Sequence, residues 1–67
     1  MAVARITEIS ASSKKSFEAA VAEGVGRAND TLRGVTGAWV QDQEVVVVDG
    51  RITEYRVKLK VTFILEG

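Results

Sequence analysis

The chain has 67 residues, no cysteine and no histidine, and its nine basic residues balance nine acidic ones. This length accommodates a single domain, residues 1–67, and the composition excludes disulfides and disfavours zinc. A net charge of zero gives no general attraction to nucleic acid. No apolar run is longer than that of Val45 to Val48, which is far too short to cross a membrane. The N-terminus does not follow the pattern of a signal peptide, so we expect a cytoplasmic location. Domains this small commonly need oligomerisation for stability, and we expect it here.

The first half of the chain predicts a strand followed by a helix. Residues 2–10 are expected to form a short strand, and serines then precede a predicted helix over 14–33, with Ser13 as its N-cap. Gly34 is the expected left-handed residue that closes the helix. Small and apolar residues recur at helical spacing and predict one buried stripe: Phe17, Ala20, Val21, Gly24, Val25, Ala28 and Leu32.

Gly24 and Gly26 form a Gly-x-Gly motif, but it lies inside the helical pattern and lacks a third glycine. A phosphate-binding loop needs its glycines between a strand and the start of a helix. Close packing of the helix on a sheet is the better interpretation of this motif.

The second half predicts a long hairpin. A strand over 35–48 leads to Asp49-Gly50, a dipeptide favoured in two-residue turns, and a strongly alternating strand follows over 54–66. With a two-residue loop, Val48 faces Arg51, and the residue numbers of every facing pair add up to 99. This register pairs Val40 with Leu59 and Ala38 with Val61 on the apolar side. On the other side it pairs Trp39 with Lys60, Gln41 with Lys58, and Gln43 with Arg56; a bulged loop would shift it.

The predicted fold is therefore α+β, a β-α-β-β chain with one helix on one face of a three-stranded antiparallel sheet. The other face is left open and carries Trp39 and a basic row of Arg56, Lys58 and Lys60. This row is a solvated or subunit-paired surface rather than a nucleic-acid site. Trp39 is interpreted as a subunit contact or as a stacking platform for a planar ligand.

Catalysis has little support in the sequence. Asp42 and Glu44 share a strand face, but we expect them at the rim of the helix side as solubilising charges. Without a convincing acid–base pair, we expect a protein that is not an enzyme. Oxygen ligands favour calcium among metals, yet the acidic residues are spread singly and the chain has no EF-hand loop; a site assembled between subunits is the open alternative.

As a whole the chain resembles the dodecin family. The resemblance rests on the strand and serine-capped helix, Arg27-Ala28-x-x-Thr31-Leu32-Arg33, the Asp49-Gly50 hairpin, and the ending Val61-x-Phe63-x-Leu65-Glu66. It implies a hollow homododecamer and binding of flavins such as riboflavin or FMN. It also implies a tryptophan that stacks on the flavin and a glutamine that binds the polar edge of the ring.

In this sequence those two family positions hold other residues. Gly37 stands at the position of the stacking tryptophan and Arg56 at that of the glutamine, while Trp39 lies two residues further on. A flavin would then stack on Trp39, with Arg56 and either Gln41 or Gln43 holding an anionic group. Alternatively, residues 55–61 resemble a subgroup described as calcium-binding, which implies a shell that binds calcium, or a structural or partner-binding assembly, without flavin.

Overall fold

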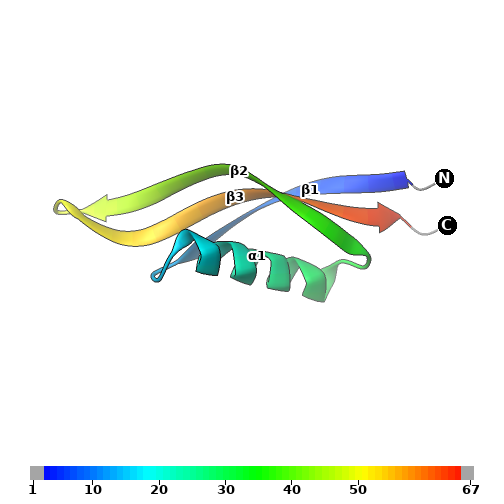
Figure 1. The fold of residues 1–67 in the computed structure, drawn as a ribbon, viewed down its shortest axis with the longest axis horizontal. Helices are drawn as coiled ribbons and strands as arrows, with labels where there is room; N and C mark the ends of the chain where they lie inside the picture. Colours follow the sequence, from blue (N-terminus) through cyan, green and yellow to red (C-terminus); the bar gives the residue numbers. More distant parts are fainter. Residues whose placement is uncertain (1–2, 66–67) are drawn as a thin grey trace.

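The computed structural model describes residues 3–65. Its elements are β1 (Val3–Ser13), α1 (Phe17–Thr31), β2 (Val35–Val48) and β3 (Arg51–Leu65). The strands form one antiparallel sheet in the order β1-β3-β2, and α1 lies across one face of it, as Figure 1 shows. The predicted β-α-β-β fold is confirmed. Among the described residues, no helix has the length and hydropathy needed to span a membrane.

The first strand and the helix have different limits from those predicted. β1 continues to Ser13, because β3 offers it pairing partners as far as Tyr55; residue 2 of the predicted strand lies outside the described residues. Ser16, not Ser13, is the N-cap, and its Oγ accepts a hydrogen bond from the Ala19 amide at 3.0 Å. The Ser13 Oγ instead accepts from the Lys15 amide in the preceding turn.

The helix also ends earlier than predicted. Its C-cap is Leu32, in an extended conformation, and the Leu32 amide donates to the Ala28 carbonyl. Gly34 does have a positive φ of 73°, but it serves the turn into β2, where its carbonyl accepts from the Ile64 amide at 2.9 Å. The prediction of a left-handed residue was correct and its assignment to the helix cap was wrong.

A narrow core lies between α1 and the central strand. Val57, Leu59 and Val61 of β3 are fully buried against Ala20 and Ala28 of the helix. Gly24 also packs closely: a Cβ added there would lie 2.9 Å from Leu59 Cδ1 and 3.1 Å from Ala11 Cβ. The predicted close helix–sheet packing is thus confirmed at Gly24. At Gly26, a Cβ would meet nothing within 4 Å.

We expect alanine at Gly24 and alanine at Gly26 to change the stability of the fold in different ways. Gly26→Ala should stabilise the fold by about 0.5–1 kcal/mol through helix propensity alone. Gly24→Ala gains the same propensity but crowds Leu59 and Ala11, so it should be less stable than Gly26→Ala by about 1–3 kcal/mol. Denaturant unfolding at one protein concentration measures both. Equal midpoints would contradict the close approach at Gly24.

The hairpin turn is as predicted, but the register is only partly so. Asp49 and Gly50 both have positive φ, at 51° and 76°. The residue numbers of facing pairs add up to 99, as expected, next to the turn and from Val40↔Leu59 to Gly37↔Thr62. Between these two stretches they add up to 100. The extra residue Thr53 on β3 begins this shift, and the extra residue Gln41 on β2 ends it. A further shift lies between Val35 and Gly37.

The subunit is too extended to bury its own apolar surface. Its extents are 51 × 18 × 14 Å and its radius of gyration is 13.7 Å, whereas a compact chain of this length has about 11 Å. Its accessible surface is 5146 Å², against about 4100 Å² for a compact monomer of this mass. Exposed apolar side chains such as Ile6, Val47 and Ile52, each more than half exposed, account for part of this excess.

Candidate functional site

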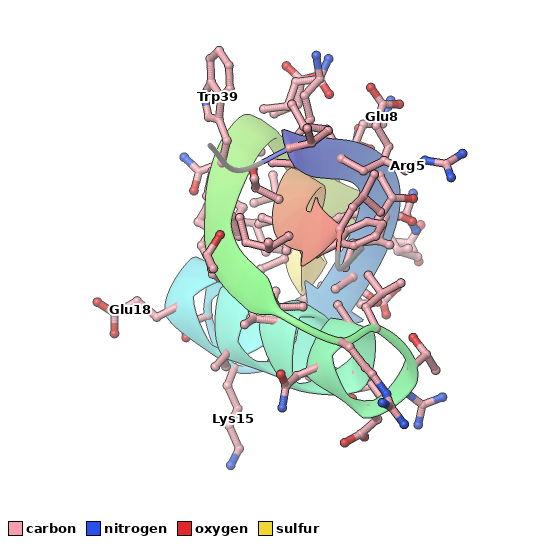
Figure 2. All side chains as sticks on the ribbon, turned by 90° about the vertical axis from the view of Figure 1, so that its right-hand side faces the viewer. Arg5, Glu8, Lys15, Glu18 and Trp39 are labelled. Atoms are coloured by element: carbon pink, nitrogen blue, oxygen red, sulfur yellow. The ribbon has the colours of Figure 1, made fainter. Side chains whose placement is uncertain are left out.

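The candidate site lies on the sheet face opposite α1, which we call the open face. β3 turns Val57, Leu59 and Val61 toward the helix, so its intervening residues point the other way. Figure 2 shows Trp39 and Glu8 on the side of the sheet away from the helix. Strand pairing places the following residues on this face: Ala4, Ile6, Glu8, Ser10 and Ser12 from β1, Glu54, Arg56, Lys58, Lys60, Thr62 and Ile64 from β3, and Gly37, Trp39, Asp42, Glu44 and Val46 from β2.

One row of the open face crosses all three strands. Glu8 pairs with Lys60, and Lys60 pairs with Trp39, as predicted for the last two residues. The Lys60 Nζ lies 3.9 Å from a Glu8 carboxylate oxygen and 5.8 Å from the centroid of the Trp39 ring. Each contact is worth at most about 1 kcal/mol at such exposure. Together they hold the ammonium group beside the indole, which is itself 69% exposed.

The bulge at Gln41 forms a hollow next to this row. The pairing Gln41–Lys58 was predicted, but Lys58 pairs with Asp42, and Gln41 is the extra residue. Gln41 and Lys58 nevertheless line a shared hollow of about 210 Å³, together with Glu8, Ile9 and Ser10. An amide, an ammonium and a carboxylate therefore surround a small open space beside the tryptophan row.

Asp42 and Glu44 do not lie on the helix side, and that prediction was wrong. The bulge at Thr53 shifts β2 by one residue, so Glu44, not Gln43, pairs with Arg56. An Arg56 guanidinium nitrogen lies 3.7 Å from a Glu44 carboxylate oxygen. Gln43 pairs with the buried Val57 and so belongs to the helix side of the sheet. The basic row thus faces an acidic partner from a neighbouring strand at each position: Glu8, Asp42 and Glu44.

Gly37 leaves space on the open face beside Trp39. It pairs with Thr62, one row along from Lys60, and a Cβ at this position would meet nothing within 4 Å. Arg56, in contrast, lies four residues from Lys60 along β3, which is about 13 Å at the rise of a strand. Of the five candidate ligand contacts, Trp39, Gly37 and Gln41 are therefore neighbours, Arg56 is distant on the same face, and Gln43 is on the other face.

Glu8 and Ser10 are site residues that the sequence interpretation missed. The two-residue turn predicts the register of the hairpin strands, but no such local signal fixes the register of the first strand. The order β1-β3-β2 is the missing information, because it places β1 against the basic row. The alternation of Glu8, Ser10 and Ser12 with the core residues Ile9 and Ala11 was the available signal.

The fold and its exposed faces define a small α+β subunit with more apolar surface than it can bury alone. A model of the dodecin family matches residues 3–66, and the chain belongs to this family. Its β-α-β-β subunit matches the subunits of dodecins, and a dodecameric assembly is consistent with the family.

Three similarities to known proteins give detail. The calcium dodecin of Mycobacterium tuberculosis is 41% identical over 64 residues, covering 94% of this chain and 89% of the relative. The dodecin from Streptomyces davaonensis has a TM-score of 0.93 at 29% identity, covering 98% and 97% of the two chains. The structure of the M. tuberculosis calcium dodecin, described as calcium-chelating with a novel calcium-binding site, has a TM-score of 0.83 at 34% identity, covering 96% and 91%.

Proposed function

We propose that this protein is a homo-oligomeric binding protein, not an enzyme, that takes a planar ligand of the flavin type, such as riboflavin or FMN, on its open face. The observation that carries this proposal is Trp39, 69% exposed beside the unfilled space at Gly37. A large exposed indole favours contact with another apolar plane, and stacking on it covers much of its surface. Gly37 gives such a plane room next to the indole.

The polar contacts of the ligand are assigned by their distance from Trp39. Gln41 offers an amide that can both donate to and accept from a flavin ring edge. Lys58 lines the same hollow and offers an ammonium for the phosphate of FMN. Arg56 is about 13 Å from the Trp39 row and lies 3.7 Å from Glu44, so in this proposal it contacts only a ligand tail or a ligand held by another subunit.

Calcium binding is the second candidate, and the 41% identity to a calcium dodecin favours it. Glu8, Asp42, Glu44 and Glu54 are open-face carboxylates that could serve as hard oxygen ligands. Within residues 3–65, however, no three acidic groups come together closely enough to hold a metal ion. A calcium site in this chain would therefore combine carboxylates from different copies in the oligomer.

Titration of the purified oligomer separates the two candidates. Stacking on Trp39 should quench flavin fluorescence at micromolar riboflavin or FMN, and Lys58→Gln should weaken FMN binding more than riboflavin binding. Calcium is added in parallel to chelator-treated protein in a calorimeter. Absence of quenching by either flavin would contradict the flavin proposal. A heat of calcium binding that saturates, together with no flavin quenching, would support the calcium candidate.

A further inference from the structure

The open face differs in character on the two sides of the row that contains Trp39. Toward the start of β1, the next row is Ile6–Thr62–Gly37, in which the Ile6 side chain is 58% exposed. Toward the hairpin turn lies the hollow of about 210 Å³ at the Gln41 bulge, which we call the Gln41 hollow. A planar ligand stacked on Trp39 therefore has an apolar side chain near one end and polar groups near the other. A ligand that is itself apolar at one end is oriented with its polar edge toward the hollow.

The Gln41 hollow contains one carboxylate among groups that donate hydrogen bonds. The residues that line it are Glu8, Ile9, Ser10, Gln41 and Lys58. An ionised carboxylate only accepts hydrogen bonds, an ammonium only donates them, and an amide or a hydroxyl does both. The Glu8 side chain is 67% exposed, and its ion pair within residues 3–65 is the 3.9 Å contact with Lys60. A carboxylate has about four acceptor sites, so this contact leaves acceptor capacity for a ligand.

We infer that Glu8 accepts a hydrogen bond from the N–H of a cyclic imide at the polar edge of the ligand, and that it selects ligands that carry this group. An imide presents a carbonyl, an N–H and a second carbonyl, so its complement is a donor, an acceptor and a donor. Glu8 is the acceptor. The donors are the Lys60 ammonium beside it and the Gln41 amide across the hollow. Flavins carry such an edge, and this inference rests on the proposed function because stacking on Trp39 places the edge.

Other charged groups of the open face are less suited to this contact. Asp42 and Glu44 line a separate hollow, and Glu54 lies further along β3 toward the turn. Arg56 has only donors, so it cannot accept a hydrogen bond from an imide N–H. Glu8, on the outer strand β1, supplies the acceptor that Arg56 does not.

Methylation of the imide nitrogen of riboflavin tests the contact, because it removes the N–H and keeps the planar ring. The wild type should bind riboflavin about 10-fold more tightly than the imide-methylated form, since a carboxylate covered by the ligand without a donor is costly. Glu8→Ala should weaken riboflavin binding about 10-fold without weakening binding of the methylated form. Glu8→Gln keeps the shape and a neutral acceptor, so it should give an intermediate ratio. Flavin fluorescence quenching measures each dissociation constant.

Glu18→Ala is the matched control. It removes an exposed carboxylate from α1, which Figure 2 shows far from Trp39, and should keep the wild-type ratio of the two affinities. Light scattering checks the oligomer in every variant. A wild-type ratio near one, or a ratio that neither Glu8 variant changes, overturns the role of Glu8 while the stacking proposal stands. Absence of quenching by both flavins overturns the proposed function and this inference together.

Discussion

Leu59→Ala is expected to cause the largest loss of stability of any single truncation in the core, about 2–5 kcal/mol. Leu59 is the largest of the fully buried side chains, and it lies on the central strand beneath α1. Only a few residues of this subunit are buried, and small domains have only about 5–15 kcal/mol of stability in total. The free energy of unfolding, measured with denaturant at fixed protein concentration, should therefore fall by a large fraction.

Two further variants make this prediction specific to packing. Leu59→Met conserves volume and should cost less than about 1.5 kcal/mol. Gly24→Ala should be better tolerated in the Leu59→Ala background than in the wild type, because the new Cβ would enter space that Leu59 Cδ1 occupies, 2.9 Å away. Additive effects of Leu59→Ala and Gly24→Ala would show that the two residues do not share this space.

Trp39→Ala is expected to have the largest effect on ligand binding. Removing the stacking surface should raise the dissociation constant for riboflavin about 10- to 100-fold, since buried aromatic contacts of this kind are worth about 1.5–3 kcal/mol. Flavin fluorescence quenching measures this loss. Trp39→Phe retains an aromatic plane and should recover part of the affinity.

The oligomeric state of the same variant distinguishes stacking from subunit contact. If Trp39 serves the ligand, light scattering should give the wild-type size for Trp39→Ala while quenching is lost. An assembly that breaks down together with binding would instead assign Trp39 to an interface. Unchanged flavin affinity in an intact oligomer would rule out Trp39 as the platform.

The elements were predictable from the sequence because their signals are local. The helical stripe, the Asp49-Gly50 turn and the alternation of β3 each follow from a few neighbouring residues, and the structure confirms all three. The N-cap could not be predicted from local sequence, because several serines in this segment are suitable N-cap residues. The pairing of β1 with β3 extends to Ser13, so Ser13 belongs to the strand. Ser16, directly before the helix start at Phe17, is therefore the N-cap.

The candidate site was only partly predictable because bulges carry little sequence signal. Trp39 was correctly placed opposite Lys60, yet Glu44 rather than Gln43 lies opposite Arg56. Neither Thr53 nor Gln41 is a residue type that marks a bulge, so the sequence predicts a single register through both. Glu8 was missed for a different reason: its contact with Lys60 depends on strand order, a non-local property.

The bulges at Thr53 and Gln41 have opposite effects on the register of the hairpin, so the second cancels the first. The extra residue Thr53 on β3 changes the phase of pairing, and the extra residue Gln41 on β2 restores it before Trp39 is reached. Only residues 42–46 of β2 pair in the shifted register. In this segment Asp42 and Glu44 lie opposite Lys58 and Arg56, where the unshifted register would place Gln41 and Gln43. A pair of bulges can therefore change the charges on this surface while the position of Trp39 stays the same.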